Sequence, residues 1–490
     1  MNNEGIDNRD LKQKTAQGLF WGFLSSGAMQ LLNLIIGIFL ARLLSPEEYG
    51  IVGMLAIFSL IAGNLQDSGF GVALINIKHI TNNDYNSVFW LNIVVSVCLY
   101  TVLSLCSPLI AAFYHQPCLI PLSRFIFLGF IFAAIGITPN AKLTRNLQVK
   151  EKAIISILAL LISGTVGVVM ATKGFSYWSL ATQQVLYNFV VCIGRYYFAR
   201  WHPTLKVDFT PVRQMFSFSY KVLITSILTT INNNVLTVIF GRLFPANAVG
   251  NFTQANKWNT MANQLVSNTV AQVAQPVFTR VNDDEHERQC RVFGKLLRFT
   301  AFLAFPAMFG LSLVAPQVIL LTIGEQWTDS IPLLQILCIS GAFLPLYTVY
   351  QNQLLSLGKS DYFMWLTLAQ IVIMLVAVLA CHSMGVKSMT IAFAAINILW
   401  LLVWQVVTSR MIGYRMVTML KDVLPFLCIS LAVMGITYVV TLPLDNLYLS
   451  LVTRVALAAL IYALVMKLSG AVIFEECINY LSDRFKRNRQ

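Results

Sequence analysis

Long runs of apolar residues, separated by short polar loops, constrain this 490-residue chain more than any other feature. Hydrophobic residues make up 57% of the sequence and charged residues 11%, and the mean hydropathy is +0.69. A soluble fold of this composition would have too few polar side chains to cover its surface. A lipid bilayer suits it instead, because about 20 apolar residues in a helix cross a hydrocarbon core about 30 Å thick with their backbone hydrogen bonds made internally.

Hydropathy along the chain predicts an all-α polytopic membrane protein of about fourteen transmembrane helices. The expected spans are 18–41, 49–75, 88–113, 121–138, 153–172, 175–198, 216–244, 247–279, 293–321, 331–356, 361–384, 388–409, 422–442 and 447–468. We expect two pseudo-symmetric six-helix lobes, residues 1–210 and 211–415. A helix pair and a basic cytoplasmic tail follow in residues 416–490.

Lysine and arginine are distributed unevenly between alternate loops. With the N-terminus inside, 27 of the 34 lie in inner loops and tails, and 6 lie in outer loops. By the positive-inside rule this bias predicts that both termini are cytoplasmic. It also predicts that the polar segment 247–279 crosses the membrane, because otherwise the basic residues from Arg280 onward would face outward. The net charge of +13 therefore reflects topology, and no nucleic-acid partner is expected.

Cysteine spacing and loop length exclude several other classes. The nine cysteines are scattered, mostly within spans, without the spacing of a metal site or a disulfide framework, so neither a metal nor another cofactor is expected. The outer loops are too short to hold paired carboxylates or bases in a cleft, so an enzyme is not expected.

The sequence repeats itself at an offset of 200 residues. Residues 41–50 align without a gap with residues 241–250, and three positions are identical: Arg42 and Arg242, Leu43 and Leu243, Gly50 and Gly250. Six predicted spans separate the copies. Because that number is even, the copies have the same orientation and should be related by an axis along the membrane normal.

A helix with one polar face precedes the loop in each copy. Positions 26, 30, 33 and 37, and likewise 226, 230, 233 and 237, fall at intervals of four, three and four, and they include Gln30, Asn33 and Asn233. Because polar groups avoid lipid, the two faces are expected to look at each other across a cavity. Arg42 and Arg242 at its outer mouths either anchor helix ends at the headgroups or bind phosphate.

The segment 247–279 carries two further polar lines at helical spacing. One comprises Thr253, Asn256, Thr260, Asn263 and Ser267, and the other Lys257, Gln264, Asn268, Gln272 and Gln275. A lysine at bilayer depth costs at least ~2.5–3.5 kcal/mol on insertion scales, so Lys257 should face water, a partner or a ligand. Two interpretations follow. Either the amides join helices and Lys257 pairs with a buried carboxylate, or the face lines a solvated cationic cavity that suits an anionic ligand.

Several short motifs resemble those of a known family. Residues 41–50 read ARLLSPEEYG, which resembles the loop after the first helix in Wzx-type polysaccharide-unit exporters of the MOP flippase superfamily. The strings GEQW at 324–327, LGKSD at 357–361 and QPVF at 275–278 resemble second-half signatures of that family. The resemblance covers nearly the whole chain and is closest to the branch of colanic acid exporters and similar lipopolysaccharide biosynthesis proteins.

The resemblance implies an alternating-access flippase of the bacterial inner membrane. Its partners would be undecaprenyl-pyrophosphate-linked oligosaccharide, membrane lipid and other polysaccharide assembly proteins, with coupling to Na⁺ or H⁺ left open. Its cavity would be lined by the first, second, seventh and eighth helices, which carry Gln30, Asn33, Asn64, Asn233, Lys257 and Asn263. The alternatives are a multidrug or cation antiporter of the same superfamily, a peptidoglycan-precursor or teichoic-type flippase, and a membrane glycosyltransferase or polymerase.

Overall fold

The computed structural model describes residues 8–67, 74, 80–204, 227–232, 234–281, 286–470 and 473–475. Every regular element in these ranges is a helix, which confirms the all-α class for this part of the chain. The chain divides into two compact units, Met1–Gly250 and Asn251–Gln490. The expected lobe boundary at residue 210 lies in 205–226, outside the described residues, and stays a prediction.

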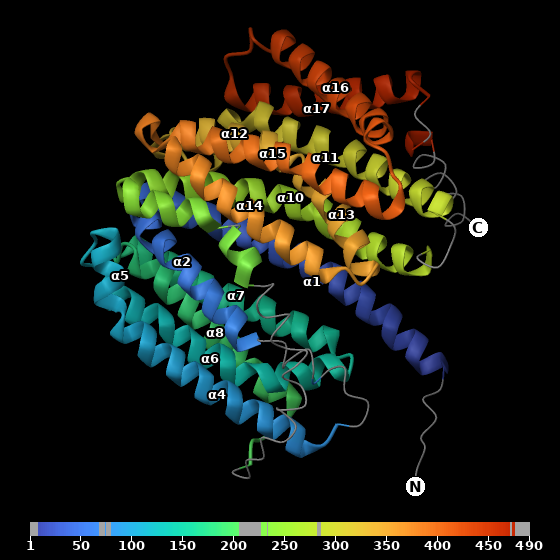
Figure 1. Ribbon diagram of the computed structural model, residues 1–490. Helices are drawn as coiled ribbons and strands as arrows, with labels where there is room; N and C mark the ends of the chain where they lie inside the picture. Colours follow the sequence, from blue (N-terminus) through green and yellow to red (C-terminus); the bar gives the residue numbers. More distant parts are fainter. Residues whose placement is uncertain are drawn as a thin grey trace. The chain divides into compact units, whose positions relative to one another are not determined.

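Helix α6 is central to the first unit. It packs against α2, α4, α5, α7 and α8, while α1 packs along α7 (Figure 1). Trp201 lies in a buried cluster with aromatic and aliphatic side chains of this unit. Its indole N–H donates to Oδ1 of Asn82, the first residue of α4, at 2.8 Å. The helices are α1 (Asn8–Leu43), α2 (Pro46–Asp67), α4 (Asn82–Leu105), α5 (Ser107–Tyr114), α6 (Leu119–Arg145), α7 (Val149–Thr172) and α8 (Trp178–Ala199).

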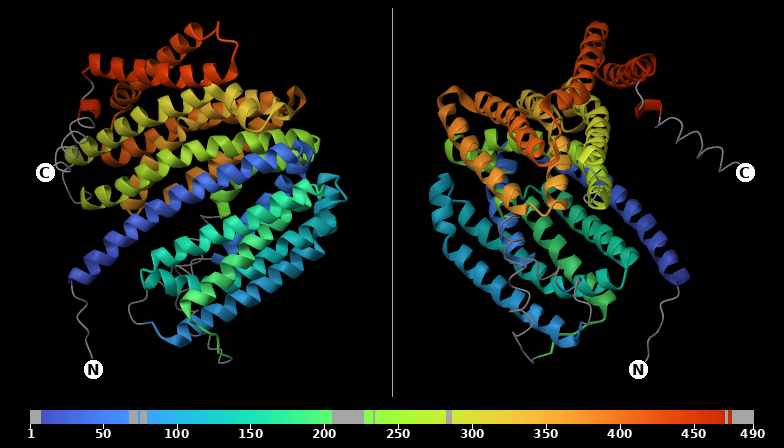
Figure 2. Two further views of the ribbon diagram at one scale, coloured as in Figure 1. Left: turned by 180° about the vertical axis from the view of Figure 1, so that it is seen from behind. Right: turned by 45° about the vertical axis from the view of Figure 1, so that its right-hand side comes forward.

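Helix α11 is central to the second unit, as α6 is to the first. It packs against α12, α13, α15, α16 and α17, and the last two form a hairpin (Figure 2). Polar contacts join α17 to α11, because Arg454 donates to the carbonyl of Leu313 at 3.1 Å and the hydroxyl of Tyr462 to that of Phe302 at 2.9 Å. The helices are α11 (His286–Thr322), α12 (Ser330–Gly341), α13 (Leu344–Ser356), α14 (Ser360–Ala380), α15 (Gly385–Ile412), α16 (Met416–Val440) and α17 (Leu447–Leu468).

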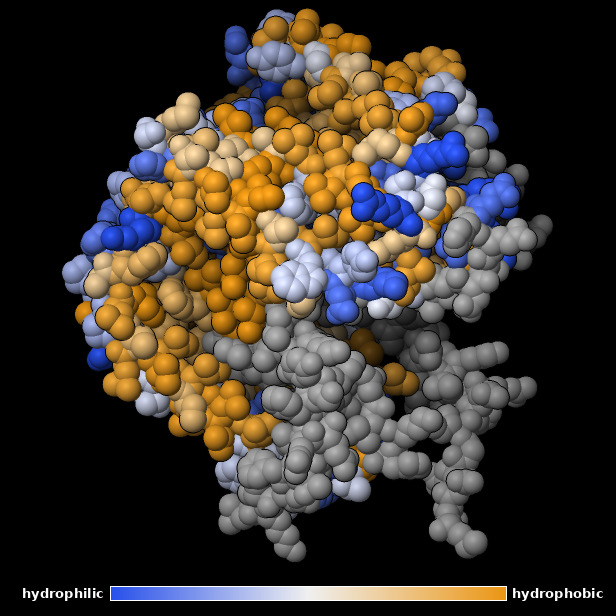
Figure 3. Space-filling model, in the orientation of Figure 1, coloured by the Kyte–Doolittle hydropathy of each residue, from blue (hydrophilic) through white to orange (hydrophobic). Residues whose placement is uncertain are grey.

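Ten helical stretches in the described part of the chain are long and apolar enough to cross a membrane. Apolar side chains cover most of the visible described surface, and hydrophilic ones gather near the helix ends (Figure 3). The protein is thus an all-α multi-span membrane protein. Three further predicted spans are also helices in this structure: α2, α8 and α10 (Ala246–Val281). A fourth, 216–244, is described only in part, so the number fourteen stays a prediction.

Two predicted spans are interrupted by proline. The span 88–113 is divided into α4 and α5 next to Pro108, and the span 331–356 into α12 and α13 next to Pro345. Proline has no N–H to offer the carbonyl four residues earlier. That carbonyl needs another donor, and in the first unit the hydroxyl of Ser107 donates to the Ser104 carbonyl at 2.8 Å.

Candidate functional site

Helix α10 is polar on nearly every side, and the structure separates its residues into a packed face and an open face. Asn251, Gln254, Asn259 and Asn263 are buried. Gln264 and Asn268 are exposed, and Lys257, Thr260 and Asn256 are partly exposed. At 100° per residue, Lys257, Gln264 and Asn268 lie within about 40° of one another, so they form one continuous polar face.

The packed face is held to α12 by hydrogen bonds. The hydroxyl of Ser330 donates to Oδ1 of Asn251 at 2.8 Å, and Nδ2 of Asn263 donates to the Gly341 carbonyl at 2.8 Å. The Gly341 carbonyl is the acceptor that Pro345, four residues later, leaves without a backbone donor. Asn263, predicted as a cavity residue, therefore compensates a helix break in this structure. The sequence signal was present in Pro345, but only the fold brings Asn263 to it.

Lys257 lies on the open face of α10. Its side chain makes no hydrogen bond or ion pair with any residue that the structure describes, and the recorded ion pair in the second unit joins Arg298 and Asp422. The interpretation that Lys257 pairs with a buried carboxylate thus has no support in the described residues. Within the described ranges, the ammonium group of this partly exposed residue thus has no protein partner, and its N–H donors are left for other groups.

The two copies of the repeat have the same local structure. In both, a helix ends at the leucine of the motif (Leu43, Leu243) and the next begins three residues later. In the first copy, Ser45 and Glu48 form a reciprocal cap, because the Ser45 N–H donates to the Glu48 carboxylate at 2.6 Å and the Glu48 N–H to the Ser45 hydroxyl at 3.4 Å. Such a capping box satisfies two otherwise free backbone donors.

Gly50 and Gly250 meet at a very close helix crossing within the first unit. A Cβ at Gly50 would lie 1.8 Å from the carbonyl oxygen of Ala246, and a Cβ at Gly250 would lie 1.7 Å from that of Pro46. The relation is reciprocal, as expected for two copies related by a twofold-like axis. Only glycine leaves room for this approach, which explains why the repeat has glycine at this position in both copies.

The two motif arginines are both exposed. Arg242 contacts Nε2 of His115, and its guanidinium lies 5.5 Å from the ring centroid of Phe113. Both partners lie at the end of α5 in the same unit. Arg242 thus contacts the end of a neighbouring helix, and its role at headgroups or on a phosphate stays a prediction.

The remaining predicted site residues belong to the first unit. Nδ2 of Asn64 donates to the hydroxyl of Thr230 at 2.6 Å, which joins α2 to the helical segment that contains Thr230. Gln30 is partly buried and Asn33 is exposed. Asn233 lies outside the described residues.

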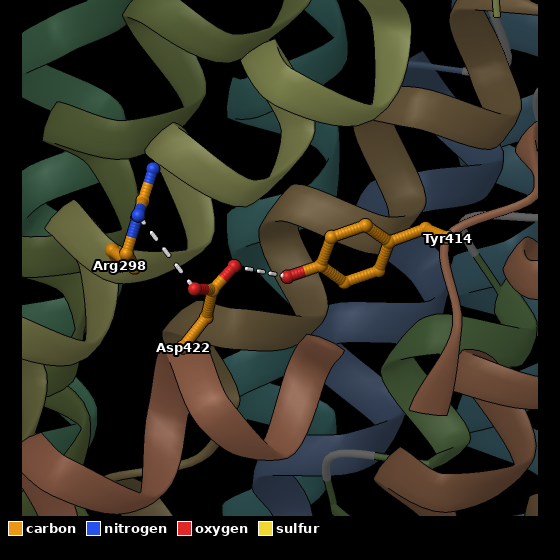
Figure 4. A network of polar contacts seen from close by, with 3 residues as sticks. All are labelled: Arg298, Tyr414 and Asp422. Carbon is orange, nitrogen blue, oxygen red and sulfur yellow. Dashed lines mark hydrogen bonds and ion pairs between the residues drawn. The ribbon is translucent and has the colours of Figure 1, made fainter. Parts of the chain in front are cut away.

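Sequence reasoning missed a polar network in the second unit, shown in Figure 4. The Tyr414 hydroxyl donates to Oδ2 of Asp422 at 2.5 Å, and a guanidinium nitrogen of Arg298 lies 3.7 Å from the other carboxylate oxygen. Burial, and next the hydrogen bond to Asp422, raise the pKa of Tyr414 above its ordinary value. The three residues lie far apart in the sequence, and no local pattern connects them.

Comparison with known protein families shows which family the chain belongs to. A family model described as polysaccharide biosynthesis protein matches residues 39–332, which is more than half of the chain. The chain belongs to this family. Polysaccharide biosynthesis is also the context of the exporters whose motifs the sequence resembles.

Individual known proteins are similar to this chain over most of its length. The chain is 26% identical to the lipopolysaccharide biosynthesis protein WzxC of Escherichia coli, over 68% of each chain. It superposes on the lipid II flippase MurJ, in an inward closed conformation, with a TM-score of 0.71 and 13% identity, over 93% of this chain and 99% of that chain. An inward-facing multidrug transporter of the MATE family gives a TM-score of 0.63 with 17% identity, over 79% of this chain and 94% of that chain. At these identities the two structures support the fold alone.

Proposed function

We propose that this polysaccharide biosynthesis family member flips undecaprenyl-pyrophosphate-linked oligosaccharide repeat units across the bacterial inner membrane by alternating access. The units would serve assembly of a surface polysaccharide such as O-antigen, capsule or exopolysaccharide. The observation that carries the proposal is the open polar face of α10, where Lys257 is a cation without a partner among the described residues. In this proposal the membrane is the bacterial inner membrane and both termini are cytoplasmic.

The physical problem is to bring a diphosphate and a hydrated glycan through hydrocarbon about 30 Å thick. Stripping the water from each sugar hydroxyl without a replacement costs several kcal/mol. Amides and hydroxyls such as Gln264, Asn268 and Thr260 replace those hydrogen bonds weakly and at many points, while Lys257 attracts the diphosphate. In this proposal Gln30, Asn33, Asn64, Asn233 and Asn256 also contact the substrate during transport, and Arg42 and Arg242 attract its phosphate.

Replacement of Lys257 by alanine tests the proposal. We expect Lys257→Ala to leave lipid-linked oligosaccharide on the inner leaflet and to lower surface polysaccharide at least tenfold, because the diphosphate loses its cationic contact. Leaflet accessibility of the lipid-linked sugar is measured in cells whose own flippase is absent. Lys257→Arg retains the charge and should retain most transport.

The matched control is Lys387→Ala, because Lys387 is an exposed lysine in the first turn of α15. Both variants are checked for membrane insertion and thermal stability. Normal transport by Lys257→Ala would contradict the cationic anchor. Export of organic cations by the wild-type protein, with no effect on lipid-linked sugar, would favour the multidrug antiporter instead.

A further inference from the structure

A cavity of about 370 Å³ lies in the second unit, where α11 begins and α15 passes into α16. Its size is within the range of about 300–1,000 Å³ that is typical of small-molecule sites. Three arginines line it: Arg291 and Arg298 from α11, and Arg415 from the link between α15 and α16. The charge distribution of the chain predicts that this end of the unit is cytoplasmic.

The charges around this cavity are not balanced. The acidic lining residues are Glu287 and Asp422. Asp422 already accepts the Tyr414 hydroxyl and pairs with Arg298, so its carboxylate is occupied. Arg291 and Arg415 are exposed and make no hydrogen bond or ion pair with any residue in the described ranges. Within those ranges, the donors of these two guanidinium groups are therefore not used by the protein.

Contacts with neighbouring residues hold Tyr414 and Asp422, which line the cavity, in place. The ring of Tyr414 contacts that of Phe293 with centroids 5.0 Å apart, and the Tyr414 carbonyl accepts Nε2 of Gln405 at 2.7 Å. Gly413, at φ 75°, turns the chain between α15 and Tyr414. Gly294 leaves room for Asp422, because a Cβ there would lie 2.9 Å from its Oδ2. A site whose supporting residues are fixed needs little reorganisation to bind a ligand.

We propose that this cavity binds a phosphate-bearing anion through Arg291 and Arg415, with Arg298 held beside them by Asp422. The planar guanidinium group matches phosphate oxygens with paired hydrogen bonds, whereas a carboxylate-lined cavity would repel them. The anion is either a soluble diphosphate or the phosphate of a lipid headgroup, and both provide the same chemistry. The inference goes beyond the transport proposal, because it assumes nothing about the substrate that crosses the membrane.

The experiment uses the purified full-length protein and two probes. Inorganic pyrophosphate is titrated by calorimetry into protein in a neutral detergent. Retention of phosphatidylglycerol is measured by native mass spectrometry after reconstitution in nanodiscs of phosphatidylcholine with phosphatidylglycerol. The test variant is Arg291→Gln with Arg415→Gln. The matched control is Arg410→Gln, which removes an exposed arginine in the last turn of α15 that does not line the cavity.

We expect the double variant to weaken at least one probe tenfold or more, while Arg410→Gln binds as the wild type does. Loss of pyrophosphate binding alone identifies a soluble diphosphate, and loss of lipid retention identifies a headgroup. Arg291, Arg415 and Arg410 are exposed, so we expect their replacement to leave the fold intact. Unfolding temperatures equal to that of the wild type would establish this. The proposal is overturned if the wild type binds neither probe, or if the double variant binds both as tightly as the wild type. Because binding is measured without transport, a failed flippase proposal would leave this result intact.

Discussion

Tyr414 and Asp422 form a hydrogen bond between a buried hydroxyl and a carboxylate. The Tyr414 hydroxyl oxygen lies 2.5 Å from Oδ2 of Asp422. We expect Tyr414→Phe to lower the free energy of unfolding by about 1.5–3 kcal/mol at neutral pH, the usual range for a hydrogen bond to a charged group. A thermal melt of the purified protein measures the loss as a lower unfolding temperature.

The pH dependence of this difference follows from the raised pKa of Tyr414. The folded state holds the proton more tightly than the unfolded state, in which the tyrosine pKa is near its ordinary value of 10.0. The stabilisation is therefore complete below about pH 10 and declines as the pH rises beyond it. Melts of wild type and variant should converge above that pH. A constant difference up to the most alkaline pH would contradict the assignment.

Gly50 provides a second test at the scale of one residue. Alanine at this position would push a Cβ into the backbone carbonyl of Ala246, and backbone cannot rotate away as a flexible side chain can. We expect Gly50→Ala to destabilise the protein by at least ~1–3 kcal/mol, the usual cost of overpacking. Gly63→Ala is the control on the same helix, because nothing lies within 4 Å of its added Cβ. Equal expression and equal melts for the two variants would exclude a close crossing at Gly50.

At the scale of the element, the break between α12 and α13 depends on a donor from another helix. Asn263→Ala removes the Nδ2 that donates to the Gly341 carbonyl, so a buried acceptor is left unpaired. We expect a loss of about 1–3 kcal/mol in unfolding free energy. Adding Pro345→Ala supplies a backbone N–H to that same carbonyl, so the double variant should recover part of the loss. Additive effects of the two substitutions in a double-mutant cycle would refute the coupling.

The helices differ in how far the sequence predicted them. Apolar runs placed most spans close to the observed bounds, as for 447–468 and α17 (Leu447–Leu468). Hydropathy could not show that 88–113 and 331–356 are each two helices, because proline removes a single donor without making a segment less apolar. The polar segment 247–279 was instead predicted to cross the membrane from the charge bias of the loops, and it lies within the 36 residues of α10.

At the scale of the whole molecule, the topology is open to direct test. Green fluorescent protein fused after residue 490 should fluoresce, and alkaline phosphatase fused after Asp445 should be active, since the charge bias puts these sites inside and outside. Alkaline phosphatase inserted at residues 282–285, after the polar helix α10, should be inactive. Activity there would show that α10 does not cross the membrane and that the later loops are reversed.

The sequence by itself determined the membrane class, the helical periodicity and the repeat that unites Gly50 with Gly250, because hydropathy and spacing are local properties. It also identified α10 as the polar helix. Only the tertiary structure decided which of its amides are buried in contacts with other helices, as Asn263 is, and which are exposed on the same face as Lys257. The same holds for Arg298, Tyr414 and Asp422. The physical reason is that a helical period fixes which residues share a face, whereas the element that covers that face comes from elsewhere in the chain.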